Sequence, residues 1–147
     1  MIMKQVEDWM NSDVITVSGS STLPDAYWLM LDNDVRRLLV VEDGVLVGIV
    51  TLEDLRRMDP IEAAGFDIIR ISNMLANLPI RRLMTKNPKT IAPAESLVKA
   101  AQLMLRNKIS TLPVLDGDEL VGIITESDIF RAFVESEEQK EQVGRAA

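Results

Sequence analysis

The chain contains the same sequence pattern twice. Val6 to Arg57 aligns without a gap with Ile80 to Arg131, 74 residues further along, and 17 of the 52 aligned positions are identical. Two copies are too few for a solenoid, which needs three or more repeats to bury a continuous core. A copy of 52 residues is marginal alone, whereas 147 residues suffice for two halves that share a core. The repeat therefore predicts a pseudo-symmetric pair of half-domains.

The composition excludes several classes of protein. The chain has no cysteine and no histidine, so it lacks thiol nucleophiles and the side chain that most often binds metals or acts as a general base. Its net charge of -7 opposes nonspecific binding to nucleic acid. No apolar run is long enough to cross a membrane, and the N-terminus has no signal-peptide pattern. We expect a soluble, cytoplasmic protein without a metal site, a nucleic-acid partner or insertion into a membrane.

Each copy follows the order strand, helix, strand, strand, helix. Short β-branched runs predict the first strands, at Ile15 to Val17 and at Thr90 to Ile91. Aliphatic segments on either side of a turn rich in Asp and Gly predict a β-hairpin in each copy, at Leu38 to Thr51 and at Leu112 to Thr125. Second helices follow, from Leu52 to about Arg57 and from Glu126 to about Phe133. The predicted fold class is α/β (α+β), with two β-α-β-β-α repeats.

The first helix of each copy has an apolar stripe and capping residues. We expect both stripes to face a core: Leu23, Ala26, Tyr27, Met30 and Leu31 in the first copy, and Leu97, Ala100, Ala101, Met104 and Leu105 in the second. A different side of the same helices could contact a second chain. Thr22, with Asp25, and Ser96 stand where N-caps belong. Asn33 and Asn107 are expected to close the helices, because asparagine tolerates the left-handed conformation.

These elements divide the chain into four parts. We expect a first repeat at residues 1–58, a helical connector at 59–79, a second repeat at 80–134, and a charged tail at 135–147 that frays or extends the last helix. The connector has apolar residues at helical spacing, namely Ile68, Ile71, Leu75 and Leu78. Such a helix either covers the shared core or offers an apolar surface to a second subunit.

A seven-residue motif recurs where each hairpin runs into its second helix. Gly48 to Asp54 and Gly122 to Asp128 both contain a glycine, two aliphatic residues, a threonine, two variable residues and an aspartate. A threonine at a helix N-terminus lies where free N–H groups favour phosphate, and a carboxylate one turn later can bind ribose hydroxyls. The Thr-x-x-Asp pattern is also a near match to a capping box, which binds no ligand. The motif leaves both interpretations open.

Further short motifs recur in the same order. In the first copy they are Trp9-Met10, Thr16-Val17 and Val35 to Val41, and in the second copy Leu83-Met84-Thr85, Thr90-Ile91-Ala92-Pro93 and Ile109 to Val114. Together with the Thr-x-x-Asp motifs, and over about Val6 to Phe133, they resemble a tandem pair of CBS (cystathionine β-synthase) domains, a Bateman module. The resemblance implies a regulatory binding module, not an enzyme. Its two sheets would pack face to face and leave clefts for AMP, ADP, ATP or S-adenosylmethionine.

The resemblance also implies roles for individual residues. Asp54 and Asp128 would hold ribose, and Thr51 and Thr125 would approach phosphate. Ten residues would line the adenine: Thr16, Val17, Leu38, Thr90, Ile91, Pro93, Ser110, Thr111, Leu112 and Pro113. The first copy departs from the family pattern, with Leu39 where a proline is usual and Ser18-Gly19 in place of Ala92-Pro93.

Two arginines distinguish the first copy from the second. Arg36 and Arg37 precede its second strand, and a guanidinium group can bind phosphate through two hydrogen bonds. Alternatively, these charges protect a solvated strand edge from pairing with another chain. Because Ser110 and Thr111 take these positions in the second copy, we expect unequal clefts.

Three classes of function remain open. The leading hypothesis is a sensor of AMP, ADP or ATP that binds in clefts between the repeats and signals to a separate, unknown partner protein, with no required cofactor. S-adenosylmethionine or NAD is an alternative ligand. A ligand-free assembly module is the second class, and the resemblance favours a homodimer whose four repeats form a disk. An enzyme is the third class, which we do not expect because no nucleophile and base pair can be identified.

Overall fold

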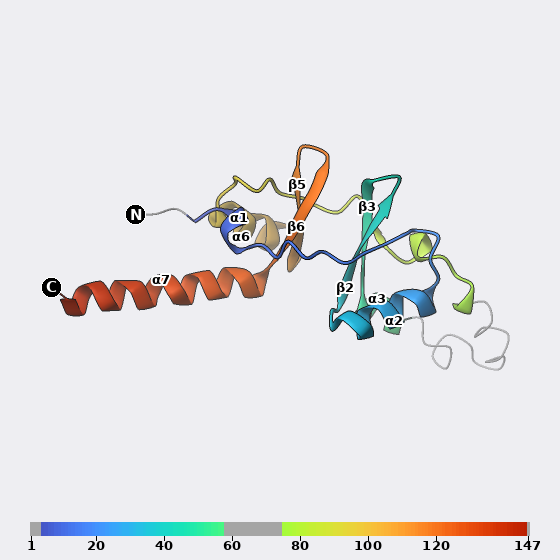
Figure 1. Ribbon diagram of the computed structural model, residues 1–147, viewed down its shortest axis with the longest axis horizontal. Coiled ribbons are helices and arrows are strands. Elements are labelled where there is room, and N and C mark those ends of the chain that lie inside the picture. Colours follow the sequence, from blue (N-terminus) through green and yellow to red (C-terminus); the bar gives the residue numbers. More distant parts are fainter. Residues whose placement is uncertain (1–3, 58–74, 147) are drawn as a thin grey trace. The chain divides into compact units, whose positions relative to one another are not determined.

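Figure 1 shows the computed structural model, which describes residues 4–57 and 75–146. Its chain divides into two compact units. The first unit is Val14–Pro88, and the second unit combines Met1–Asp13 with Lys89–Ala147. Each unit contains a sheet and helices, so the predicted α/β (α+β) class is confirmed.

The first unit is built on a four-stranded sheet in the order β1-β2-β3-β4. The strands are β1 (Thr16–Val17), β2 (Arg37–Glu42), β3 (Val45–Thr51) and β4 (Thr85–Lys86). β1 runs parallel to β2, whereas β2 with β3 and β3 with β4 are antiparallel. The helices are α2 (Leu23–Asn33), α3 (Leu52–Arg56) and the short 3-10 helix η1 (Ile80–Arg82). Eight residues form the buried core: Val17, Ala26, Met30, Leu38, Val40, Val50, Leu55 and Ile80.

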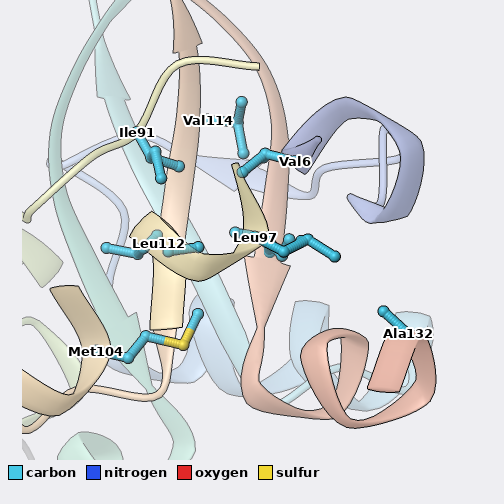
Figure 2. Packing of buried hydrophobic residues seen from close by; sticks show 9 residues of the cluster. Val6, Ile91, Leu97, Met104, Leu112, Val114 and Ala132 are labelled. Carbon is cyan, nitrogen blue, oxygen red and sulfur yellow. The ribbon is translucent and has the colours of Figure 1, made fainter. Parts of the chain in front are cut away.

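The second unit repeats this arrangement with fewer regular strands. β5 (Thr111–Asp116) and β6 (Glu119–Thr125) form its hairpin, and the helices are α1 (Val6–Trp9), α6 (Leu97–Asn107) and α7 (Glu126–Ala146). Isolated bridges, Ile91 to Val114 and Asn11 to Ile123, stand where the first unit has β1 and β4. Figure 2 shows the buried side chains that gather between the hairpin and the helices: Val6, Ile91, Leu97, Ala100, Met104, Leu112, Val114, Ile124 and Ala132.

The compact units do not coincide with the two sequence copies, because the leading segments of the copies are exchanged. Val6 of the first copy is buried in the core of the second unit, and its counterpart Ile80 is buried in the core of the first unit. The described residues form two clusters of buried hydrophobic residues, and each cluster contains residues of both copies. The repeat boundaries at 58, 79 and 134 stay a prediction.

Two glycines of the hairpins make room for the exchanged segments. A Cβ atom on Gly48 would lie 2.4 Å from the Sδ atom of Met84, and a Cβ on Gly122 would lie 2.6 Å from that of Met10. Real Cβ atoms essentially never approach another heavy atom this closely. The glycine of the Thr-x-x-Asp motif is thus required by packing, since it lets a methionine of the other copy lie directly on the strand.

The N-caps follow the prediction, but the C-caps do not. The Oδ2 atom of Asp25 accepts a hydrogen bond from Thr22 N at 3.3 Å, and Ser96 Oγ accepts one from the following helix at 3.0 Å. The left-handed residues are Asp34 (φ 51°) and Lys108 (φ 55°), each one position later than predicted. Both asparagines remain helical because their side-chain amides donate at 2.8 Å to carbonyls four residues earlier in the chain: Asn33 to Leu29 and Asn107 to Leu103.

Both apolar stripes face a core, as predicted, but only over part of their width. Ala26 and Met30 of α2 are buried, but Tyr27 is 40% exposed and Leu31 is 50% exposed. On α6, Leu105 is 81% exposed. Each exposed residue directly follows a buried one and so lies about 100° further around the helix, beyond the face that meets the sheet. Both helices therefore keep apolar side chains on their outer surface.

The predicted connector lies mostly outside the described residues, which resume at Leu75. There, Leu78 N donates to Leu75 O at 3.2 Å, and Pro79 forms an isolated bridge with Thr22. The charged tail extends the last helix, because α7 continues for 21 residues (Figure 1). Within the described parts of the chain, no helix has both the length and the apolar content needed to cross a membrane.

Candidate functional site

The Thr51 motif forms both hydrogen bonds of a capping box, and the Thr125 motif forms one of them. In the first unit, Asp54 Oδ2 accepts from Thr51 N at 2.8 Å, and Thr51 Oγ1 accepts from Asp54 N at 3.2 Å. In the second unit, Asp128 Oδ2 accepts from Thr125 N at 2.8 Å and from the Thr125 hydroxyl at 3.1 Å. The motifs therefore satisfy the first N–H groups of their helices. Each carboxylate uses Oδ2 for this purpose and keeps Oδ1 for another partner.

In the first unit, three of the predicted site residues share one face of the sheet. Leu38 points into the core, so the alternation of side chains places Arg37 and Leu39 on the opposite face. Thr51 is the register partner of Arg37, and Thr16 is the register partner of Leu39. The structure thus brings Thr16, Arg37 and Thr51 together on the sheet face that points away from the core.

The second unit has the same arrangement around a different set of side chains. Leu112 points into the core, so Thr111 and Pro113 lie on the opposite face, and Thr125 is the register partner of Thr111. Thr111 is only 8% exposed. Its Oγ1 atom has no hydrogen-bond partner among the described residues. A buried hydroxyl without a partner is costly, which favours a ligand atom at this position.

A backbone hydrogen bond ties the start of each second strand to the start of the following helix. Leu52 N donates to Arg36 O at 2.8 Å, and Glu126 N donates to Ser110 O at 3.0 Å. Arg36 and Ser110 are therefore fixed beside the two Thr-x-x-Asp turns. The Arg36 side chain is 69% exposed and lies 4.0 Å from the Glu53 carboxylate. Such an exposed pair is weak, so the guanidinium group can take another anionic partner.

The predicted adenine-binding residues differ in exposure. Four of them belong to the cores: Val17, Leu38, Ile91 and Leu112. Pro113 is fully buried as well. The exposed ones are Thr16 and Thr90, and the half-buried ones are Pro93 and Ser110. The assignment of this set to the base stays a prediction.

The two aspartates have different surroundings. Asp128 is 5% exposed, and its Oδ1 atom accepts a hydrogen bond from the Arg131 guanidinium, with which it forms an ion pair. Asp54 is half-buried and forms no ion pair within residues 4–57 and 75–146. Arg131 was not predicted as a site residue. Its signal in the sequence is the spacing of three residues from Asp128, which places both side chains on one face of a helix.

The helices that follow the two motifs also differ. α3 has five residues, whereas α7 has 21. The partial positive charge of a helix N-terminus needs several aligned peptide units, so it favours an anion more at Thr125 than at Thr51. At Thr51, positive charge has to come from side chains, and Arg36 and Arg37 are close by. The two turns therefore provide different electrostatic environments.

Comparison with known proteins adds a family and several relatives. The family model described as CBS domain matches residues 6–60 and 80–135. An uncharacterized protein of Methanocaldococcus jannaschii is 33% identical over 131 residues, 87% of this chain and 46% of that protein. An inosine-5'-monophosphate dehydrogenase of Korarchaeum cryptofilum is 34% identical over 129 residues, and the match covers 87% of this chain and 24% of the enzyme. This chain thus spans less than half the length of these two relatives.

Other similar proteins match over nearly their whole length. The CBS domain-containing protein YhcV of Bacillus subtilis is 34% identical over 127 residues, 86% of this chain and 84% of that protein. The structure of CBSX2 in complex with AMP has a TM-score of 0.75 and 28% identity, covering 90% of this chain and 98% of the other. Another similar structure is the CBS domain pair of protein MJ0100 in complex with 5'-methylthioadenosine and S-adenosyl-L-methionine. Its TM-score is 0.76 at 26% identity, and the match covers 92% of this chain and 99% of the other.

Proposed function

This chain belongs to the CBS domain family, and we propose that it is a regulatory module that senses an adenine nucleotide, AMP, ADP or ATP, and signals its presence to a separate protein. The observation that carries the proposal is the pair of Thr-x-x-Asp turns, each of which leaves the outer carboxylate oxygen unused by the helix cap. The similarity to a structure solved with AMP supports the choice of an adenine nucleotide. The proposal includes no catalytic step.

In each unit, the aspartate would accept hydrogen bonds from the ribose hydroxyls, and the threonine turn would bind phosphate. At the first unit, Asp54 has the more accessible carboxylate, and Arg36 and Arg37 lie beside the turn. An arginine can bind phosphate through two parallel hydrogen bonds. Because Arg36 and Arg37 place positive charge beside this turn, the first unit is the better candidate for AMP, ADP or ATP.

The adenine would lie near polar residues at two places in each copy, namely the first strand and the start of the second strand. Thr16 and Thr90 are exposed, and Ser110 is half-buried, so all three can present a hydroxyl group to the base. The unpartnered hydroxyl of Thr111 supports a polar ligand atom in the second unit. The buried aliphatic members of the predicted set would act by shaping the sheet beneath the base.

S-adenosylmethionine is a second candidate ligand, and one observation favours it at the second unit. There, Ser110 and Thr111 take the positions of Arg36 and Arg37. S-adenosylmethionine has a sulfonium cation in place of phosphate, so hydroxyl groups suit it better than guanidinium groups do. A similar CBS domain pair was solved with this ligand. The second unit would then bind a different adenosyl compound from the first.

We also propose that the chain forms a homodimer in the cytoplasm. Several large apolar side chains are exposed on the helices: Tyr27 at 40%, Trp28 at 61%, Phe130 at 64% and Phe133 at 63%. Exposed apolar groups of this size on one chain favour association with another surface. The regulated partner would be a separate polypeptide of unknown identity.

Calorimetric titration of the purified protein tests the proposed function. AMP, ADP, ATP, S-adenosylmethionine and NAD would each be titrated into the wild-type protein and into the Asp54→Asn and Asp128→Asn variants. We expect at least one adenine ligand to bind, and one substitution to weaken binding while the protein stays folded. Asp118→Asn, in the exposed turn of the second hairpin, is the matched control and should leave binding unchanged. If none of the five compounds binds to the folded protein, the proposal is wrong and the assembly alternative gains support.

A further inference from the structure

Both carboxylate oxygens of Asp128 accept hydrogen bonds from other side chains or from the backbone of this unit. Its Oδ2 atom accepts two hydrogen bonds from Thr125, and its Oδ1 atom accepts one from the Nη2 atom of Arg131. The side chain of Asp128 is 7% exposed, whereas that of Arg131 is 64% exposed. Arg131 therefore covers the one oxygen that the helix cap leaves available.

The equivalent arginine of the first unit does not do this. Arg57 occupies the same repeat position as Arg131, one residue after the end of α3, and forms no ion pair among the described residues. The neighbouring Arg56 pairs instead with Glu53, at 3.5 Å. In the second unit, Ser127 replaces Glu53, so the acidic neighbour at this position is missing. The same arginine thus has different surroundings in the two units.

We propose that Arg131 is an internal competitor that blocks the ribose-binding oxygen of Asp128 until a ligand displaces it. This inference rests on the proposed function, because it concerns the site to which that function assigns ribose. The guanidinium group of Arg131 competes with a ribose hydroxyl for Asp128 Oδ1. Within residues 4–57 and 75–146, no cation pairs with Asp54 in this way. The site of the second unit therefore binds ligand at the expense of an existing ion pair, and the described part of the first unit has no such pair.

The exposure of Arg131 sets the size of the effect. Ion pairs with one well-solvated partner are weak and are screened by salt, so the competitor can leave readily. Removing it should strengthen ligand binding at the second unit by about fivefold, the equivalent of about 1 kcal/mol. For the same reason, added salt should weaken binding at the second unit less than at the first, since it also loosens the competing pair.

The test uses two variants, each of which keeps one working site, and AMP as the ligand. The Asp54→Asn chain reports on the second unit, and the Asp128→Asn chain reports on the first. We expect Arg131→Gln in the Asp54→Asn chain to tighten AMP binding about fivefold by calorimetry. The matched control is Arg57→Gln in the Asp128→Asn chain, which removes the same charge at the equivalent position. It should leave AMP affinity unchanged or slightly lower.

The outcomes separate the inference from the proposed function. If Arg131→Gln leaves AMP affinity unchanged or weakens it, Arg131 is not a competitor, and the inference is overturned while the proposed function stands. If neither single-site chain binds AMP although both remain folded, the inference fails, and the proposed function fails with it only if ADP and ATP do not bind either. Thermal unfolding establishes that each variant is folded. Arg131→Met, which keeps a long unbranched side chain, replaces the glutamine variant if that one unfolds.

Discussion

Val6 and Ile80 occupy the same position of the repeat, 74 residues apart, and each is fully buried in the core of the unit that is built mainly from the other copy. Their backbone hydrogen bonds are equivalent as well. Val6 N donates to Glu95 O at 2.9 Å, and Ile80 N donates to Ser21 O at 2.7 Å. Each unit is therefore completed by a segment of the other copy, so neither copy is expected to fold by itself.

Truncation of these two side chains tests the exchange. Ile80→Ala should cost about 2–5 kcal/mol of unfolding free energy, and Ile80→Val about 0.5–1.5 kcal/mol, because each leaves a cavity in a packed core. Val6→Ala should also lower the unfolding free energy of the protein. Val143→Ala is the control, since Val143 is 70% exposed on α7 and should change stability by less than about 0.5 kcal/mol. Denaturant unfolding measures all four, and a Val6 variant as stable as the Val143 variant would contradict the exchange.

Substitution of the hairpin glycine tests the close approach of methionine. Gly48→Ala should destabilise the protein by about 1–3 kcal/mol, because the new methyl group would meet Met84 Sδ at 2.4 Å and Thr85 O at 2.9 Å. Combining it with Met84→Ala should recover part of this loss in a double-mutant cycle. The control is Gly144→Ala on α7, where a Cβ meets nothing within 4 Å and where alanine favours the helix. Equal thermal unfolding of the two alanine variants would argue against the close contact.

The hairpins and helix starts were predictable because their signals are local. Turns rich in Asp and Gly between aliphatic runs predicted the hairpins, and Asp43 and Gly44 do adopt positive φ values there, 51° and 78°. The exchange was not predictable. Val6 and Ile80 are similar aliphatic residues in equivalent positions, so either one fits either core. Which unit each segment joins depends on the path of the chain in space, and local sequence does not record that path.

The candidate site was predictable to the same extent. The spacing of Thr51 and Asp54 predicts a helix start with an aspartate one turn in, and the structure has this geometry. The contact between Arg131 and Asp128 was not predicted. Arg57 stands at the equivalent place in the first copy, so the sequence alone does not distinguish the two arginines, yet Arg57 forms no such pair among the described residues. The two arginines are identical and equivalent in the repeat, but their ion pairs differ because their neighbouring residues differ. Alignment of the two copies does not show this effect.

Two substitutions of Asp54 separate its capping role from its proposed ribose-binding role. Asp54→Ala removes the acceptor for Thr51 N and should cost about 0.5–2 kcal/mol of unfolding free energy, in addition to ligand affinity. Asp54→Asn keeps an acceptor oxygen, so it should retain most of the stability and still weaken AMP binding, because the charge is lost. Thermal unfolding and calorimetry of both variants make the comparison. If the asparagine variant binds AMP as tightly as the wild type, the ribose assignment at Asp54 is wrong.

The arginines beside the first turn are expected to recognise phosphate. Arg36→Gln and Arg37→Gln should each weaken ATP binding at the first unit by about tenfold, because a hydrogen bond to a charged group contributes about 1.5–3 kcal/mol at most. Adenosine, which has no phosphate, should bind the variants and the wild type equally. Arg106→Gln, at an exposed position of α6, is the control for net charge. Equal losses for ATP and adenosine would show that the arginines support the fold rather than bind phosphate.

The exposed phenylalanines of α7 are expected to hold two chains together. Phe130 and Phe133 are 64% and 63% exposed, and the first copy has no aromatic residue at either position, because Arg56 and Asp59 stand there in the sequence. Replacing both with serine should shift the protein toward the monomer in sedimentation at micromolar concentration, because burying a large apolar side chain contributes about 1.5–3 kcal/mol. Val143→Ser, a similarly exposed change on the same helix, should leave the sedimentation unchanged. A wild-type protein that is monomeric at this concentration, or a double variant that stays dimeric, would rule out this surface as the contact.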